Sequence, residues 1–214
     1  MKKISDEDLE LRARNLKELW FDVDGVMTPQ GSLVIYDLSS ESGIVFERYD
    51  GVRSVRLVPC DEHGKPLQNV VEYLAGRAEE PIFEGYRYDT RDGKVIEIAV
   101  KSGLRVFFVS GRNSPAMSRR AVNLGAIPHL GIKDKAATIV RESRCIASER
   151  CFVGDGIQDV GALRETKDGL AVAPADAAPE AHEAAHWITE ARGGEGVIHE
   201  VLRVIFAIRG IEVV

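Results

Sequence analysis

The sequence lacks several features that would assign it to a specialised class of protein. Its three cysteines, Cys60, Cys145 and Cys151, are odd in number and do not have the spacing of metal ligands, so we expect neither a disulfide framework nor a zinc site. No stretch reaches the roughly 18 apolar residues of a membrane-spanning helix. Residues 1–15 are charged throughout, without an apolar signal region. We therefore expect a cytoplasmic protein with no membrane partner.

Positive charge is also scarce. The 214 residues carry 28 Lys and Arg against 34 Asp and Glu, a net charge of -6, and contain no long basic run. This balance argues against nucleic acid as a partner, because phosphate backbones are bound by clustered Lys and Arg. An anionic small substrate would need a local cation to hold it. The rest of the composition is ordinary, with 44% hydrophobic residues, and the chain is long enough to bury a full core.

One apolar run ends in two carboxylates and a glycine. Residues 19–21 read Leu-Trp-Phe, and Asp22, Val23, Asp24 and Gly25 follow. This pattern is typical of a buried parallel strand whose carboxyl end opens into a turn, which is where open α/β sheets bind ligands. Residues two apart in an extended chain point the same way, so the side chains of Asp22 and Asp24 can face one small volume.

The same letters could form a simple turn or a calcium loop, because Asp and Gly are common in both. A calcium loop counted from Asp22 would need oxygen ligands at its fifth and ninth positions and Glu at its twelfth, but these are Val26, Gln30 and Leu33. A solvated turn does not normally follow three large apolar residues. We therefore interpret the stretch as functional.

From residue 92 onward, short apolar strands alternate with helices. This alternation indicates a parallel sheet covered by helices on both faces. The predicted fold class is therefore α/β, with a Rossmann-like core formed by residues 1–28 and 89–214. Within it we predict strands at 104–109, 127–130, 151–155 and 170–173, and helices at 94–102, 115–124, 134–143, 160–166, 179–186 and 197–208.

Residues 29–88 follow a different pattern. They contain strand-like runs separated by turn-forming residues, without the regular alternation of strand and helix. We interpret this segment as a β-rich insertion or cap on the core. The predicted strands are 32–38, 44–49, 52–58 and 81–88, with a turn at 61–66 and a short helix at 66–78.

Polar groups follow three of the predicted strands and begin one helix. Because the carboxyl ends of parallel strands lie at one edge of a sheet, these groups would share a pocket. At about 4 Å, each pair of like charges costs about 4 kcal/mol at an effective dielectric constant near 20. A cluster of four carboxylates therefore needs a cation, and oxygen ligands favour Mg²⁺. The members of this group are Asp22, Asp24, Ser110, Gly111, Lys135, Asp155 and Asp159.

Each of these residues also has a purely structural interpretation when taken alone. A Ser-Gly pair after a strand, as at Ser110, is often only a turn. Lys135 alone would be a solvated helix lysine, and Asp159 could merely cap a helix. Arg91 and Arg112 could contact an anionic substrate, since guanidinium groups suit carboxylates, or could form surface ion pairs. The occurrence of all these residues together, at strand ends and a helix start, favours the functional interpretation.

Taken in order, these segments resemble the four motifs of the haloacid dehalogenase superfamily of phosphatases. The chain more closely resembles 3-deoxy-D-manno-octulosonate 8-phosphate phosphatases and the related sialic acid 9-phosphate phosphatases, over roughly residues 15–30 and 85–208. The order of the four motifs is more specific than any one of them. The resemblance is carried by residues 22–28, 91–93, 110–112, 131–135, 154–159, 172–177 and 193–196.

The resemblance implies an α/β phosphatase that uses Mg²⁺. Asp22 would attack phosphorus and form an aspartyl-phosphate, which is covalent catalysis by a carboxylate. Asp24 would protonate the leaving oxygen and later deprotonate the attacking water. Asp22, Asp155 and the backbone carbonyl of Asp24 would bind the metal. Asp159 would not contact the metal but would orient these ligands.

The remaining motif residues would bind the substrate. Ser110 and the amide of Gly111 would hold phosphoryl oxygens, and Lys135 would offset their charge. Arg91 and Arg112 are candidate contacts for the rest of the substrate. The resemblance also implies a homotetramer and an acidic sugar phosphate similar to 3-deoxy-D-manno-octulosonate 8-phosphate as the substrate.

The chain departs from the pattern of this family at three places. Residues 29–88 replace a short hairpin, Gly156 stands where a second Asp is usual, and Glu195 stands where Lys or Arg is usual. These differences keep two alternatives open. One is the same chemistry on a neutral sugar phosphate or a nucleotide. The other is a non-catalytic binding or assembly domain that retains the fold and uses residues 29–88 as its working surface.

Overall fold

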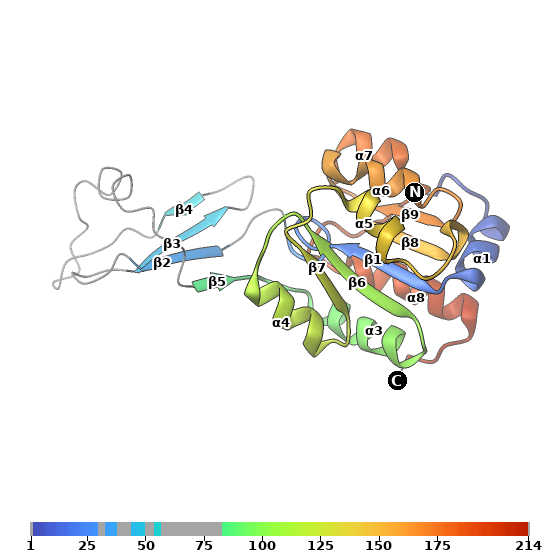
Figure 1. Ribbon diagram of the computed structural model, residues 1–214, viewed down its shortest axis with the longest axis horizontal. Helices are drawn as coiled ribbons and strands as arrows, with labels where there is room; N and C mark the ends of the chain where they lie inside the picture. The colour runs from blue at the N-terminus through green and yellow to red at the C-terminus, as the bar shows by residue number, and fades with distance from the viewer. Residues whose placement is uncertain (1, 30–32, 38–43, 50–53, 57–82, 214) are drawn as a thin grey trace. The chain divides into compact units, whose positions relative to one another are not determined.

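The computed structural model of the chain describes residues 2–29, 33–37, 44–49, 54–56 and 83–213. The chain divides into two compact units, formed by residues 1–29 with 88–214 and by residues 30–87. The first unit contains a six-stranded sheet and the second a four-stranded sheet. The predicted class, a Rossmann-like α/β core with a β-rich insertion, is confirmed (Figure 1).

The six-stranded sheet is parallel, with the strand order β10-β9-β8-β1-β6-β7. Strand β1 lies between β8 and β6, and all five of its residues are buried. This explains why an apolar sequence leads up to Asp22. The strands are β1 (Glu18–Asp22), β6 (Arg105–Ser110), β7 (Ile127–Leu130), β8 (Arg150–Val153), β9 (Leu170–Ala173) and β10 (Trp187–Ile188).

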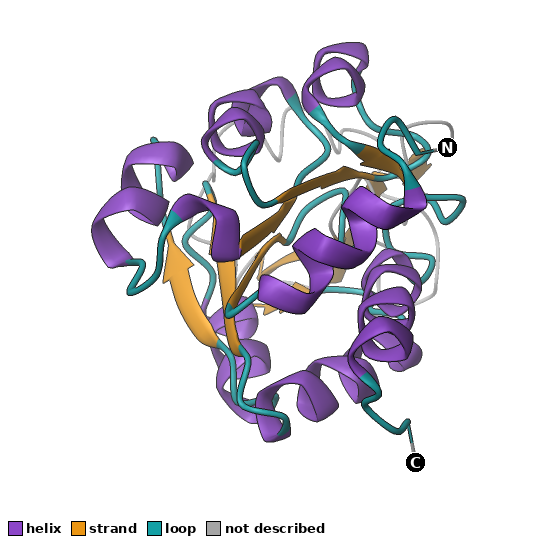
Figure 2. Ribbon diagram, turned by 90° about the vertical axis from the view of Figure 1, so that its right-hand side faces the viewer, coloured by secondary structure: helices purple, strands orange, loops and turns teal. Residues whose placement is uncertain are grey.

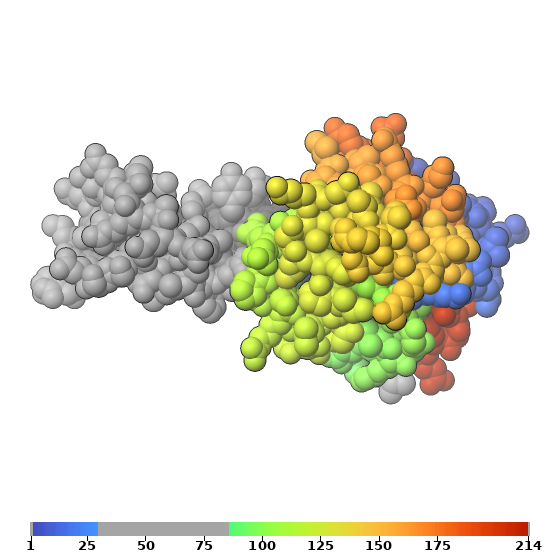
Figure 3. Space-filling model, in the orientation of Figure 1, coloured from blue at the N-terminus to red at the C-terminus, as the bar shows by residue number. Residues whose placement is uncertain are grey.

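Helices cover both faces of this sheet, as Figure 2 shows. On one face α8 packs against both α1 and α3, and on the other α6 packs against both α5 and α7. The amino-terminal α1 and the carboxy-terminal α8 therefore lie side by side (Figure 3). The helices are α1 (Asp6–Asn15), α3 (Thr90–Lys101), α4 (Pro115–Asn123), α5 (Lys135–Glu142), α6 (Val160–Glu165), α7 (Pro179–Ala184) and α8 (Val197–Arg209).

Large aromatic rings form the core beneath α5, α6 and α7. Trp20 of β1 stacks on Phe107 of β6 with the ring centroids 3.8 Å apart and the planes 6° from parallel. Phe152 of β8 joins them, and alanines such as Ala162 and Ala181 let the helices approach closely. Trp20 and Asp22 are two residues apart on β1, so the strand directs Asp22 toward the same side as this core.

Two of the predicted helix boundaries were wrong by two residues or more. Helix α3 begins at Thr90, four residues earlier than predicted, because the Asp89 side chain accepts a hydrogen bond of 2.8 Å from the Arg91 amide and caps it. Helix α7 ends at Ala184, and the chain becomes extended at Ala185. The buried Trp187 then begins β10, a strand that we did not predict.

The second unit is an antiparallel sheet with the strand order β4-β3-β2-β5. Its strands fall within the four runs that the sequence predicts. The predicted turn at 61–66 and helix at 66–78 lie outside the described residues. The strands are β2 (Leu33–Asp37), β3 (Ile44–Tyr49), β4 (Ser54–Arg56) and β5 (Phe83–Gly85).

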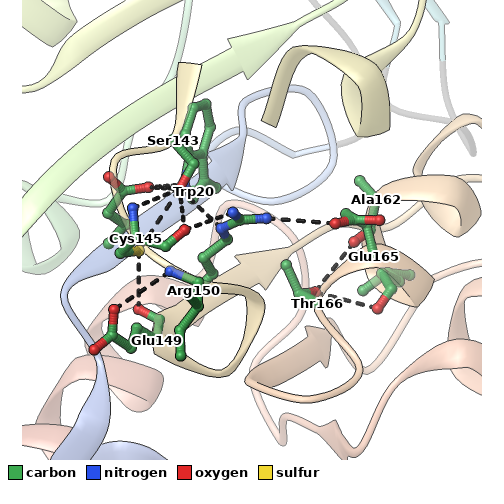
Figure 4. A network of polar contacts seen from close by, with 11 residues as sticks. Trp20, Ser143, Cys145, Glu149, Arg150, Ala162, Glu165 and Thr166 are labelled. Atoms are coloured by element: carbon green, nitrogen blue, oxygen red, sulfur yellow. Dashed lines mark hydrogen bonds and ion pairs between the residues drawn. The ribbon is translucent and has the colours of Figure 1, made fainter. Parts of the chain in front are cut away.

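A buried polar network holds the amino end of β1, at the opposite end of the strand from Asp22 (Figure 4). Glu18 is 1% exposed, forms an ion pair with Arg105, and accepts hydrogen bonds from the Ser143 hydroxyl at 2.7 Å and the Trp20 indole at 3.2 Å. Arg150 donates to the same hydroxyl at 2.8 Å. Because its partners satisfy this buried carboxylate, the network is structural.

The two edge strands of the large sheet differ in how they are protected. At one edge, Lys2 forms an antiparallel bridge with Trp187 of β10, and the Lys3 amide donates to the His186 carbonyl at 2.8 Å. At the other edge, β7 contains Pro128, which has no amide hydrogen to offer. Among the described helices, none is long and apolar enough to span a bilayer.

Asp92 joins the amino ends of α3 and α8. Its side chain is 1% exposed, and Oδ1 accepts a hydrogen bond of 2.7 Å from the His199 amide in the first turn of α8. Oδ2 has no hydrogen-bond partner among the described residues. Burial raises the pKa of Asp92 to about 7, with a smaller contribution from the charge of Asp89. Below about pH 7 the folded protein therefore favours the protonated form of this carboxyl.

Asp92→Asn should be more stable than the wild type at pH 8, and more stable by a smaller margin at pH 5. The folded pKa of about 7 exceeds the unfolded value of 3.8, so the stability that protonated Asp92 contributes is complete below pH 4 and is lost as the pH rises to about 7. The upper limit of the gain is about 4 kcal/mol. Urea unfolding at both pH values measures it.

Asp92→Ala is the matched control, because it also removes the charge but leaves the His199 amide without its acceptor. It should be about 1 kcal/mol less stable than Asp92→Asn at both pH values. If the asparagine variant were as unstable as the alanine variant at pH 8, the hydrogen bond to the His199 amide would contribute nothing to stability.

Candidate active site

Three strand ends meet at the centre of the six-stranded sheet. In the register of the sheet, Asp22 pairs with Val109 of β6, and Phe21 pairs with Val153 of β8. Ser110 is the last residue of β6, and Asp155 follows β8 by two residues. The parallel sheet thus brings together side chains that are far apart in the sequence.

Lys135 joins two of the predicted carboxylates. Its ammonium group lies 2.7 Å from Oδ1 of Asp22 and 2.6 Å from Oδ1 of Asp159, and the side chain is 3% exposed. Asp134 caps α5 by accepting a hydrogen bond from the Ala137 amide at 2.9 Å, so Lys135 enters the site from the first turn of this helix. It is a buried counter-charge here and not the solvated lysine that its residue type alone would suggest.

Asp155 and Asp159 lie on one short loop after β8. The Asp155 and Gly156 amides both donate to Oδ2 of Asp159, at 3.1 and 3.0 Å. Asp159 is fully buried and makes no capping hydrogen bond to α6, so the alternative that it is only a helix cap is wrong. It holds the loop that carries Asp155 and also pairs with Lys135.

The donor set of this site fits a divalent cation. Asp22, Asp155 and Asp159 are buried, and each offers one oxygen within 4.8 Å of the others. Three carboxylates against the one ammonium of Lys135 leave a formal charge of -2, which a divalent ion would neutralise. Burial and the charge of Asp159 raise the pKa of Asp22 well above its usual range and that of Asp155 to about 6. Oxygen-only ligands suit Mg²⁺.

Asp24, Ser110 and Arg112 form a second group beside the carboxylates. The Ser110 hydroxyl lies 3.4 Å from Oδ2 of Asp24 and accepts a hydrogen bond of 3.0 Å from the Arg112 amide. The Arg112 guanidinium lies 3.5 Å from the same Asp24 oxygen. Gly111 lies between Ser110 and Arg112 in the turn after β6. Unlike Asp22, Asp24 remains partly exposed, at 31%, so it can exchange protons with a substrate or with water.

Known proteins are similar to this chain in sequence and in fold. No model of a known protein family matches the chain. The chain is 30% identical over 157 residues to the 3-deoxy-D-manno-octulosonate 8-phosphate phosphatase of Yersinia pestis, covering 71% of this chain and 80% of that one. It is 32% identical over 162 residues to the enzyme of Escherichia coli, covering 73% and 82%. The chain belongs to the 3-deoxy-D-manno-octulosonate 8-phosphate phosphatase family.

A solved structure of this family has the same fold. The enzyme of Moraxella catarrhalis, which was crystallised with magnesium, phosphate and 3-deoxy-D-manno-octulosonate (KDO), superposes with a TM-score of 0.68 at 19% identity, covering 95% of this chain and 93% of that one. Membership of the family makes this protein a phosphatase. The alternative of a non-catalytic domain is therefore wrong.

A glycine-rich segment of this phosphatase packs against the turn that follows Asp24. Gly25 has a φ of 81°, and a Cβ there would lie 2.0 Å from Asp155, so only glycine fits between the two loops. A Cβ on Gly193 would lie 2.2 Å from the Gly25 carbonyl oxygen, and the Gly194 amide donates to the Val26 carbonyl at 2.9 Å. Residues 193–196 thus pack against and support the turn that follows Asp24.

The two candidate arginines occupy different positions. Arg112 lies beside Asp24, as described above. Arg91 is 57% exposed, pairs with Asp89 at 2.6 Å and donates to the Glu195 carbonyl oxygen at 3.0 Å. It therefore connects α3 to the glycine-rich segment. Among the described residues, no hydrogen bond or ion pair joins Arg91 to the carboxylates of the cation site.

Sequence reasoning missed two residues that lie at this site. Thr28 is fully buried, and both its amide and its hydroxyl donate to the Val23 carbonyl, which closes the turn after Asp22. Gln158 folds back over Gly156. The sequence carries no signal for the role of Thr28. The signal for Gln158 is a polar side chain two positions after a glycine that replaces an aspartate.

Proposed function

We propose that this protein hydrolyses 3-deoxy-D-manno-octulosonate 8-phosphate, or a closely similar acidic sugar phosphate, with Mg²⁺ and through an aspartyl-phosphate. The observation that carries the proposal is the buried group of Asp22, Lys135, Asp155 and Asp159 at adjoining strand ends. Its support is the similarity, over more than two thirds of the chain, to enzymes that act on this substrate.

In the first half of the reaction, a carboxylate oxygen of Asp22 attacks phosphorus. The bond from phosphorus to the sugar oxygen breaks, and that oxygen keeps the electron pair and takes a proton from Asp24. Lys135 and the Val23 amide both contact Oδ1 of Asp22, at 2.7 Å each, so the nucleophile is held in one orientation. The Ser110 hydroxyl and the Gly111 amide would donate hydrogen bonds to phosphoryl oxygens.

In the second half, water replaces Asp22 on phosphorus. Asp24 takes a proton from the attacking water, the bond from phosphorus to the Asp22 oxygen breaks, and inorganic phosphate leaves. The carboxylate of Asp22 and the protonated Asp24 are thereby restored. The Ser110 hydroxyl and the Arg112 guanidinium both lie close to Oδ2 of Asp24, which fixes the orientation of this acid and base in both halves.

Mg²⁺ would be held by Asp22, Asp155 and the backbone carbonyl of Asp24, with Asp159 holding the loop in place. When bound, it supplies positive charge to the phosphoryl oxygens during transfer. Phosphoryl transfer depends chiefly on positioning and charge, so this small set of residues suffices.

Recognition of the sugar would depend on Arg112, because it is partly exposed and adjoins the reacting group. Arg91 would contribute by holding residues 193–196, or directly if it leaves Asp89. Glu195 brings a negative charge to the same segment. This charge would repel an acidic sugar, so a neutral sugar phosphate is the substrate to compare. We also propose that residues 29–88 act as a cap, that the active form is a homotetramer, and that the protein is cytoplasmic.

We expect wild-type enzyme with Mg²⁺ to release phosphate from 3-deoxy-D-manno-octulosonate 8-phosphate with a higher kcat/KM than from a neutral hexose phosphate or a nucleoside monophosphate. An excess of EDTA should abolish activity, and Mg²⁺ should restore it. Phosphate release across the three substrates measures this.

Equal kcat/KM values for the acidic and the neutral sugar would refute the assignment of substrate. An absence of activity on all three, and on an aryl phosphate, would refute the assignment of function. Arg112→Ala should raise KM for the acidic sugar more than for the neutral one, whereas Arg119→Ala, on the exposed side of α4, should change neither.

A further inference from the structure

Gly156 is not required by the conformation of its backbone. Its φ of -108° and ψ of 172° are extended values that any residue adopts. Gly25, in the neighbouring loop of the same site, has a φ of 81° and needs glycine. The absence of a side chain at position 156 therefore has another cause.

The space beside Gly156 is filled by a different side chain. A Cβ at position 156 would lie 2.2 Å from Nε2, 2.3 Å from Oε1 and 2.4 Å from Cδ of Gln158. All three distances are shorter than real Cβ contacts, so the carboxamide occupies the place that the side chain of residue 156 would take. Gly154, on the same loop, is instead crowded by the Asp159 side chain and the Phe152 ring.

A short turn brings Gln158 to this position. Residues Ile157–Asp159 form one turn of 3-10 helix, and the Asp159 amide donates to the Gly156 carbonyl at 3.0 Å. The backbone that the carboxamide covers is the one that carries Asp155 and donates to Asp159. The carboxamide therefore lies over the loop that presents the carboxylates of the cation site, and Gln158 is otherwise exposed to solvent.

We propose that Gln158 is a positioning residue of the cation site, supplying the polar group that Gly156 lacks. This inference rests on the proposed function. Mg²⁺ keeps several of its waters when bound to protein, and a carboxamide oxygen accepts hydrogen bonds from such waters without adding charge. A neutral group suits this site, because its three carboxylates already exceed the single buried lysine.

Isothermal titration of the metal-free protein with Mg²⁺ tests the proposal without relying on activity. Gln158→Met keeps the length of the side chain and removes its polar atoms, and it should weaken Mg²⁺ binding about tenfold. The melting temperature in EDTA should be unchanged, because Gln158 is exposed. Ile157→Ala is the matched control, because Ile157 lies on the same turn and is 66% exposed. It should bind Mg²⁺ as the wild type does.

A rescue separates positioning from simple packing. Gly156→Asp combined with Gln158→Ala places a carboxylate in the vacated space and should bind Mg²⁺ more tightly than Gln158→Ala alone. Gly156→Asp by itself should be poorer than this double variant, because the new side chain meets Gln158.

Wild-type Mg²⁺ affinity in Gln158→Met, or a double variant no better than Gln158→Ala, would overturn the role of Gln158 while leaving the phosphatase assignment intact. If the wild type bound no Mg²⁺ and showed no activity, both the proposed function and this inference would fail.

Discussion

Asp22→Asn should lower kcat by roughly 10⁴-fold or more, the scale seen when an enzyme loses its nucleophile. The amide has nearly the same shape but cannot attack phosphorus, so no acyl-phosphate forms. The fold should survive, because the substitution removes one of three crowded carboxylates and burial already raises the pKa of Asp22. Single-turnover phosphate release, together with the melting temperature in EDTA, measures both effects.

Asp168→Asn is the control, since Asp168 is exposed and lies outside the site. It should retain wild-type kcat. If Asp22→Asn kept more than one hundredth of the wild-type rate in freshly purified protein, another group would have to be the nucleophile. Trapping of phosphate on the wild-type protein by rapid acid quench, and its absence in the variant, would identify the bond that forms.

Lys135→Met should destabilise the metal-free protein by about 3 kcal/mol or more at pH 8. The variant leaves Asp22 and Asp159 buried without their ammonium partner, and removing one member of a buried ion pair typically costs about 3–5 kcal/mol. The loss should shrink toward pH 5, because Asp22 can then carry a proton in place of its partner. Urea unfolding in EDTA at both pH values gives the difference.

Lys133→Met provides the comparison, because Lys133 is exposed just before α5. Its effect should stay within about 0.5 kcal/mol. Saturating Mg²⁺ should recover part of the stability lost in Lys135→Met, since the ion neutralises the same carboxylates. A loss below about 1 kcal/mol at pH 8 would mean that Lys135 is not the counter-charge that its 2.7 Å and 2.6 Å contacts indicate.

Local sequence predicted the parts of this site that depend on the strands. An apolar run followed by a polar tip is sufficient to place Asp22, Ser110 and Asp155 at one edge, because a parallel sheet aligns the ends of its strands. Lys135 is different. No property of a single lysine near a helix start distinguishes a buried counter-charge from a solvated side chain, and only its place in the order of motifs predicted its role.

The structural details that sequence could not supply depend on contacts between distant segments. The direction of Arg91 is set by Asp89 and by the Glu195 carbonyl, and the latter lies 104 residues away. Strand β10 is two residues long, too short for a periodic pattern. Gly156 suggested that a polar side chain was missing from the loop, because the sequence does not show that Gln158 turns back over this position.

The protection of the two sheet edges has a consequence for the behaviour of the protein at high concentration. A bare strand edge invites a second molecule to add its own strand, which is a common first step toward aggregates. Here the bridge from Lys2 blocks one side, and Pro128 interrupts the row of donors on the other. The amino-terminal residues thus help to keep copies of this core from joining strand to strand.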